Sequence, residues 1–263
     1  MAEDALFEQI EDGLVLPLDP ARGPWTPDAL HGGPTAILLA RAAEPLLEGL
    51  HPARATIELL RPVPVAPLRV TARALRPGRK VRLVGAEVAT DDGTLVASAT
   101  VLGIRVADVP APVTPTPELP PAPDTLAPAP KGVVAVANDY TAFHNTGVEH
   151  RFARGSFLEV GPATDWIRLA VPVVAGEAPT PLQRVMAAAD FGNGISRMAA
   201  FEELLFINPD LTVYLHGLPA GEWVALEAAT HLEQHGVGLA QSVLWDERGM
   251  IGRSLQSLLL DAR

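Results

Sequence analysis

The sequence contains no cysteine and few aromatic residues. Of its 263 residues, none is Cys, and Phe, Trp and Tyr together make up 5%. The absence of thiols excludes a disulfide framework, a thiolate zinc site and a cysteine nucleophile. Hydrophobic residues nevertheless reach 48%. A chain of this length and composition can build one large domain or two domains of ordinary size, with a sizeable core.

Positive charge and long apolar runs are also scarce. The formal net charge of −11 disfavours nucleic acid as a partner, because phosphate binding needs clustered Lys and Arg. It does not exclude an anionic small ligand, since a local basic patch can outweigh the global charge. No apolar run approaches the roughly 20 residues that span a bilayer, and the amino terminus is acidic, unlike a secretory signal. We therefore expect a cytoplasmic protein with no membrane partner.

Proline is concentrated in one segment. Nine prolines lie between residues 110 and 130. Such a segment forms neither a helix nor a central strand and should run extended, as a semi-rigid spacer. We predict two folded units, residues 1–109 and 132–263, joined by a linker at residues 110–131.

The two units repeat one order of secondary-structure signals. In each, a helical stretch is followed by alternating runs typical of antiparallel strands, with turn signals between them. Further strand-like segments precede each helix. The expected helices cover residues 35–50 and 181–205, the second broken near 190–194. The expected strands cover residues 7–18, 55–60, 68–75, 81–90, 95–106, 147–160, 165–171, 211–216, 222–232, 238–245 and 250–260.

This repetition predicts a duplicated α+β fold. One long helix followed by a strand meander indicates an antiparallel sheet curled around a central helix. The second expected helix is rich in small residues, including three consecutive alanines at 187–189. Small residues allow a sheet to wrap closely around such a helix. We therefore expect two tandem halves, each with a curled antiparallel sheet around a central helix.

Five segments carry a resemblance to a known family. They are LHGGPTA at 30–36, LRP at 60–62, LVASAT at 95–100, FINPDLTVYLH at 206–216 and GMIGRSLQ at 249–256. Their order across the two halves resembles TesB-like type II acyl-CoA thioesterases, over nearly the whole chain except the proline-rich segment. The resemblance implies a double hot-dog fold and hydrolysis of acyl-CoA thioesters to free acid and CoA. It implies no cofactor and no metal, and a place in fatty acid metabolism.

The resemblance also implies three catalytic residues. The family places an Asp, a Thr and a Gln around the water that attacks the thioester. The Asp matches Asp190 and the Gln matches Gln256, whereas the position of the Thr holds Asn208. An amide can still hydrogen-bond a water or a carboxylate. Asp190 is thus expected to be the base, with Asn208 and Gln256 orienting the water.

Each of these residues also has a structural interpretation. Asp190 could cap a helix that restarts near Phe191, where Asp is favoured for reasons unrelated to catalysis. Gln256 could make a structural hydrogen bond inside the last strand. Asn208 precedes Pro209, and that pair is an ordinary turn initiator.

The segment His31-Gly32-Gly33 precedes the first expected helix. Backbone N–H groups at a helix start can bind a carbonyl or phosphate oxygen. The glycines could equally serve a tight turn that needs their torsional freedom. We expect His31, Gly32, Gly33 and Gly192 to contact the substrate, while His31 as a base competes with a structural role.

Other kinds of site find no match in the sequence. There is no phosphate-binding loop or Gly-x-Ser-x-Gly elbow, and the histidine spacings do not fit a metal site. The alternative function is a non-hydrolytic acyl-CoA or acyl-lipid binding protein, motivated by Asn208 in place of Thr. An enoyl-CoA hydratase ranks third, because neither expected helix shows a well-placed Asp/His pair. The sequence leaves acyl chain length and oligomeric state open, although homo-oligomers formed through sheet edges are compatible with this fold.

Overall fold

Antiparallel strands make up most of the protein, whose computed structural model describes residues 5–130 and 140–262. The first half of the chain contributes β1 Phe7–Glu11, β2 Leu14–Pro17, β3 Leu50–Leu59, β4 Leu68–Arg76, β5 Val81–Thr90 and β6 Leu95–Arg105. The second half contributes β7 Val148–Arg154, β8 Ala163–Leu169, β9 Leu204–Ile207, β10 Asp210–Leu215, β11 Val224–Leu232, β12 Val237–Asp246 and β13 Gly249–Ala262. Most of these strands lie where the alternation of apolar and polar residues predicts them.

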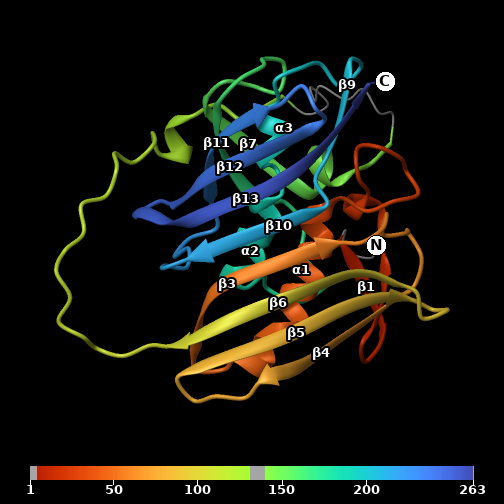
Figure 1. The fold of residues 1–263 in the computed structure, drawn as a ribbon, viewed down its shortest axis with the longest axis vertical. Helices are drawn as coiled ribbons and strands as arrows, with labels where there is room; N and C mark the ends of the chain where they lie inside the picture. The colour runs from red at the N-terminus through yellow and green to blue at the C-terminus, as the bar shows by residue number, and fades with distance from the viewer. Residues whose placement is uncertain (1–4, 131–139, 263) are drawn as a thin grey trace.

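The strands form one continuous sheet. Its order is β1-β2-β4-β5-β6-β3-β10-β13-β12-β11-β8-β7, and β9 pairs with β13 beside this path. The two halves meet where β3 pairs antiparallel with β10, with Ile57 opposite Leu211. In Figure 1 the strands cross the front of the molecule, and helices α1 (Gly32–Ala43) and α2 (Pro181–Ala189) lie behind them. Phe7 also forms a parallel bridge with Val174, so the halves are joined at a second place.

The first helix is shorter than predicted. It ends at Ala43, not near residue 50. Pro45 explains the difference, because a proline has no backbone N–H to continue the helical hydrogen bonds and its ring clashes with the carbonyl four residues earlier. The chain continues as a 3-10 turn, Glu44–Leu47, and enters β3 at Leu50, five residues before the expected start of that strand.

The predicted helix at 181–205 is wrong in its second part. α2 ends at Ala189, the short α3 covers Gly192–Ile195, and β9 begins at Leu204. Thr180 fixes the start of α2, since its hydroxyl accepts the N–H of Gln183 in a capping box. Glycines at 192 and 194 weaken continuation of the helix, because glycine has a low helix propensity.

A partly buried carboxylate ties α1 to α2. Glu44, just after α1, accepts hydrogen bonds from the Thr180 hydroxyl and from Gln183 Nε2, the latter at 2.8 Å. The C-terminal end of α1 therefore lies at the N-terminal end of α2, and the two helices pack antiparallel. Burial raises the pKa of Glu44, although these hydrogen bonds and the charge of Arg41 oppose the shift.

The proline-rich segment is largely irregular. Residues 106–122 form neither helix nor strand, and Figure 1 shows them as a long loop standing away from the body. The segment then docks on the second half, where Trp166 Nε1 donates to the Pro121 carbonyl and Arg151 Nη1 to that of Pro123, both at 2.8 Å. The boundaries at 109 and 132 stay a prediction, because residues 131–139 lie outside the described residues.

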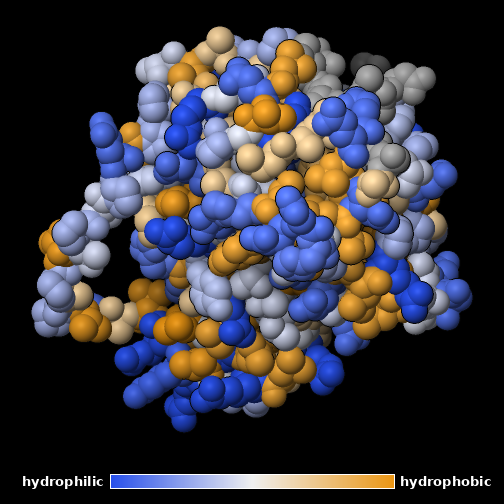
Figure 2. Space-filling model, turned by 45° about the horizontal axis from the view of Figure 1, so that its top comes forward, coloured by the Kyte–Doolittle hydropathy of each residue, from blue (hydrophilic) through white to orange (hydrophobic). Residues whose placement is uncertain are grey.

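None of the described helices has the length and apolar character needed to cross a membrane. On the face shown in Figure 2, hydrophobic residues are interspersed with hydrophilic ones. Whether each half of the sheet curls around its own central helix also stays a prediction.

We expect Glu44→Gln to change how stability depends on pH. Burial raises the pKa of Glu44 in the folded protein, so the folded state favours the protonated carboxyl. The stability that this group contributes is present below its unfolded pKa and is lost as pH rises through its folded pKa. Glutamine does not titrate, so the unfolding free energy of the variant should rise relative to wild type as pH increases from about 4, near the ordinary pKa of glutamate, through the raised pKa of Glu44. Urea denaturation measures this difference; Glu48→Gln, at an exposed position, is the control, and a constant difference for Glu44→Gln would contradict the prediction.

Candidate active site

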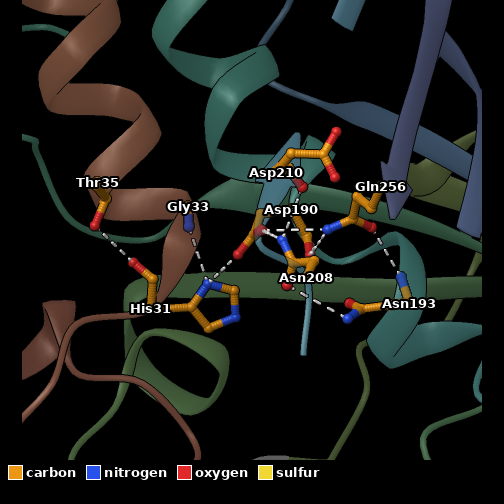
Figure 3. Close-up of polar contacts among 8 residues, drawn as sticks. All are labelled: His31, Gly33, Thr35, Asp190, Asn193, Asn208, Asp210 and Gln256. Atoms are coloured by element: carbon orange, nitrogen blue, oxygen red, sulfur yellow. Dashed lines mark hydrogen bonds and ion pairs between the residues drawn. The ribbon is translucent and has the colours of Figure 1, made fainter. Parts of the chain in front are cut away.

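The predicted site residues meet where α1 begins and α2 ends, as Figure 3 shows. His31 is the N-cap of α1, and Asp190 directly follows the last residue of α2. Because the helices pack antiparallel, the start of α1 lies beside the end of α2. Asp190 is only 5% exposed. A buried carboxylate requires hydrogen-bond donors around it.

The first partner of Asp190 is His31. Nδ1 of His31 lies 2.8 Å from Asp190 Oδ2 and 3.1 Å from the backbone nitrogen of Gly33. One ring nitrogen cannot accept from Gly33 and donate to Asp190 at the same time. This contact therefore holds one proton, either on His31 Nδ1 or on Asp190 Oδ2.

Two amides bind the other carboxylate oxygen. Asp190 Oδ1 accepts from Asn208 Nδ2 at 2.8 Å and from Gln256 Nε2 at 3.3 Å, and Gln256 Nε2 is also 3.2 Å from the Asp190 carbonyl. With the imidazole N–H as a third donor, both oxygens of an ionised carboxylate are satisfied. The positive end of the α1 dipole adds to this arrangement. We therefore favour the form in which the proton is on His31.

A second set of contacts fixes the orientation of the amides. Gln256 Oε1 accepts the backbone N–H of Asn193 at 3.1 Å, which turns its Nε2 toward Asp190. Asn193 Nδ2 donates to Asn208 Oδ1 at 3.4 Å. On β13, Gln256 is buried together with Ser254 and Leu258, as the alternation of side chains predicts.

The glycines are required by close contacts, not by torsional freedom. A Cβ on Gly32 would lie 2.6 Å from Asp190 Oδ2, and one on Gly192 would lie 2.8 Å from Gln256 Oε1. A Cβ on Gly33 would lie 2.8 Å from a ring carbon of Phe143. None of these three glycines has a positive φ. Their lack of a side chain lets the helix starts approach the polar network.

A cavity of about 90 Å³ opens beside the carboxylate. Four of the predicted residues line it: His31, Gly32, Asp190 and Asn208. Gln256, Gly33 and Gly192 belong to the same network of contacts but do not line the cavity. The sequence analysis did not select the other lining side chains, which include Trp25, His144, Phe157, Asn193, Phe201 and Phe206. No local sequence signal marks them, since they come from separate loops, from α3 and from β9 without a shared period.

A second buried Asp/His pair lies next to this cluster. His150 Nδ1 is 2.6 Å from Asp165 Oδ2, and both side chains are almost fully buried. Burial raises the pKa of Asp165, although the charge of His150 opposes the shift. The ring of Phe191 separates the two pairs, with its centroid 5.0 Å from that of His150 and 4.8 Å from that of His31.

His144 lies in the cavity wall near both pairs. Burial, assisted by the charges of His31 and His150, lowers the pKa of His144 to about 3. His144 is therefore neutral at physiological pH and adds no positive charge to the cavity. Within the described ranges 5–130 and 140–262, no group of three or more His, Asp and Glu side chains is placed to hold a metal ion.

Two interpretations of the sequence were wrong. Asp190 is not a helix N-cap, because Phe191 occupies that position of α3 and Asp190 closes α2. A well-placed Asp/His pair does exist. It was missed because His31 and Asp190 lie at the ends of two different helices.

Family models match both halves of the chain. The N-terminal domain of acyl-CoA thioesterases matches residues 21–103, and the C-terminal domain of acyl-CoA thioesterases matches residues 116–260. The chain belongs to the TesB-like acyl-CoA thioesterase family. No curated protein matches it.

Solved structures match over nearly the full chain. A candidate thioesterase from Novosphingobium aromaticivorans has a TM-score of 0.76 at 22% identity, covering 98% of this chain and 99% of its own. A hot-dog protein from Alicyclobacillus acidocaldarius has a TM-score of 0.71 at 17% identity, covering 99% and 97%. The acyl-CoA thioesterase II of Mycobacterium marinum has a TM-score of 0.66 at 16% identity, covering 98% and 96%. These likenesses and the large antiparallel sheet fit the expected double hot-dog fold.

We expect Gly32→Ala to disrupt the site and Gly194→Ala to leave it intact. A Cβ at Gly32 would overlap the Asp190 carboxylate, whereas one at Gly194, also in the cavity wall, would meet nothing within 4 Å. Overpacking of this kind costs about 1–3 kcal/mol of unfolding free energy, and a substitution into open space changes it by about 0.5 kcal/mol or less. Urea denaturation of both variants tests this, and equal effects would show that the close approach of Gly32 to Asp190 is not required.

Proposed function

We propose that the protein hydrolyses acyl-CoA thioesters to free acid and CoA, with Asp190 as the base for the attacking water. One observation carries the proposal: a buried carboxylate in a cavity wall is held by His31, Asn208 and Gln256. Membership in the acyl-CoA thioesterase family supports the reaction class. It does not by itself assign a role to any residue.

Thioester hydrolysis needs an aimed water, a base and donors for the developing oxyanion. In the proposed reaction, a water in the cavity donates a hydrogen bond to Asp190 and attacks the thioester carbon. Asp190 takes the proton as the new carbon–oxygen bond forms. The carbon–sulfur bond then breaks, and the leaving thiolate of CoA takes the proton from Asp190, which restores the carboxylate.

The N-terminus of α1 is the proposed oxyanion site. Gly32 occupies the first position of this 12-residue helix and lines the cavity. The first N–H groups of a helix lack partners within the helix, and the helix dipole favours negative charge there. A thioester carbonyl placed against Gly32 would thus receive the stabilisation that its transition state requires.

The two amides take different proposed roles. Asn208 lines the cavity and also contacts Asp190, so it can hold the water and the base together. Gln256 is 1% exposed and contacts Asp190 from behind. We therefore assign Gln256 to positioning Asp190, in place of the direct contact with water that the family resemblance implies.

The same assays test two other functions. A non-hydrolytic acyl-CoA or acyl-lipid binding protein would be stabilised by the ligand without releasing CoA. The His31–Asp190 contact at 2.8 Å favours enoyl-CoA hydration as a second candidate, because such a pair can move protons in both directions. Including an enoyl-CoA and following loss of its double bond separates hydration from hydrolysis.

The proposed reaction also implies a metabolic role, because acyl-CoA hydrolysis would place the protein in fatty acid metabolism.

We also propose that the protein can form homo-oligomers through the edges of its sheet. Light scattering on the purified protein measures its oligomeric state directly.

Asp190→Asn should abolish most hydrolysis while the protein remains folded. The amide keeps the shape of the carboxylate but cannot accept the proton from water, and loss of a general base costs about 10²–10⁴-fold in kcat. A thiol-release assay with short, medium and long acyl-CoAs measures the rate, with Asp190→Ala as a second variant. Asp246→Asn is the matched control, since Asp246 is another buried carboxylate that holds the β12–β13 turn. Wild-type turnover by Asp190→Asn would refute the assignment.

Asn208→Ala should reduce kcat by about 10–100-fold, because it removes one hydrogen bond to a charged group. Asn208→Thr should lose less, since threonine keeps a hydroxyl donor at this position. The same thiol-release assay compares the two variants. A threonine variant as slow as the alanine variant would show that the amide geometry, and not merely a donor, is required.

A further inference from the structure

One part of the cavity wall is aromatic. Trp25, Phe157, Phe201 and Phe206 line it, although Phe, Trp and Tyr make up only 5% of the chain. These residues come from the loop before α1, the loop after β7, the turn before β9 and β9 itself. An apolar wall assembled from separate segments beside a polar cluster is typical of a ligand subsite.

Three of these rings pack on one another. The centroids of Trp25 and Phe201 lie 5.6 Å apart, those of Trp25 and Phe206 5.7 Å, and those of Phe201 and Phe206 4.9 Å. These separations are those of favourable aromatic pairs. We call Trp25, Phe201 and Phe206 the aromatic cluster. Phe206 lies two residues before Asn208, so the extended chain places the cluster on the same side as this Asp190 partner.

A buried arginine braces the wall. Arg197 Nη2 donates to the Phe157 carbonyl at 2.8 Å, and its guanidinium lies 5.5 Å from the ring centroid of Phe201. Arg197 is itself 6% exposed. One side chain therefore links the segment of Phe157 to the ring of Phe201.

The size of the cavity limits what fits beside the carboxylate. An apolar cavity of about 150 Å³ holds one benzene, or about 25 Å³ per carbon. On that scale the cavity of about 90 Å³ holds between three and four carbons, and a longer acyl chain would have to extend through its open side. We propose that the aromatic cluster selects short acyl groups, of about two to four carbons, presented as CoA thioesters. This inference rests on the proposed function and names its substrate class.

The cluster suits the acyl group better than the pantetheine arm of CoA. Pantetheine carries two amides, and burying them against aromatic rings without partners is unfavourable. A short acyl chain has no polar group beyond its thioester. It would bury only apolar surface against the rings, while the thioester faces Gly32 and Asp190.

The first test is the chain-length profile of the wild-type protein. We would measure kcat/KM for acetyl-, butyryl-, hexanoyl-, octanoyl- and dodecanoyl-CoA by thiol release. The highest value is expected from acetyl-CoA to butyryl-CoA, with a fall of at least about tenfold at octanoyl-CoA. A profile that stays flat or rises toward octanoyl-CoA overturns the inference.

The second test enlarges the cavity. Phe201→Ala and Phe206→Ala each remove one ring of the aromatic cluster and should raise the octanoyl-to-butyryl ratio of kcat/KM by about tenfold. Tyr214→Ala is the control, because Tyr214 is an exposed aromatic residue of β10 that does not line the cavity. If neither cluster variant folds, Trp25→Ala, at a position already 36% exposed, makes the same measurement. An unchanged ratio in a folded cluster variant overturns the inference.

A binding measurement separates this inference from the proposed function. If wild type hydrolyses no acyl-CoA, the proposed function fails, and the thioether analogues S-propyl-CoA and S-octyl-CoA still probe the cavity. We expect S-propyl-CoA to raise the melting temperature more than S-octyl-CoA does. Equal shifts, a larger shift with S-octyl-CoA or no shift with either overturns the short-chain subsite.

Discussion

A carboxylate buried between the ends of two helices needs hydrogen-bond donors to both of its oxygens, and several elements of the fold supply them. Asp190 receives them from the N-cap of α1, the β9–β10 connection and β13. His31 belongs to the first half of the chain, whereas Asn208 and Gln256 belong to the second. Neither half supplies the full set. The junction of β3 with β10, which makes one sheet of the two halves, is therefore also a condition for the site.

The antiparallel packing of α1 and α2 places a carboxylate at each end of the helix pair. Glu44 joins the C-terminal end of α1 to the cap of α2, and Asp190 joins the other ends. Small residues allow the approach: a Cβ on Gly33 would lie 3.2 Å from the Ala187 carbonyl oxygen. Glu44 does not line the cavity, and its contacts hold the other end of the helix pair together.

The sequence predicts the parts of this structure that follow local patterns. Alternation places the strands and turns Gln256 inward, and the family resemblance selects Asp190. The helix ends were missed where Pro45 and the glycines at 192 and 194 override apolar periodicity. The His31–Asp190 pair was missed for a different reason, because no local pattern encodes a contact between a helix cap and a residue more than a hundred positions later. The aromatic wall is likewise a product of tertiary packing.

Asn208 stands where the family resemblance implies a threonine, and its neighbours indicate why an amide fits. Its Nδ2 donates to Asp190 Oδ1 while its Oδ1 accepts from Asn193 Nδ2. Asn193 in turn donates its backbone N–H to Gln256, which donates to Asp190. An amide has a donor and an acceptor on separate atoms and so closes this ring of contacts. A threonine hydroxyl is shorter and has one oxygen, so Asn193 would lose its partner or the ring would contract toward the carboxylate.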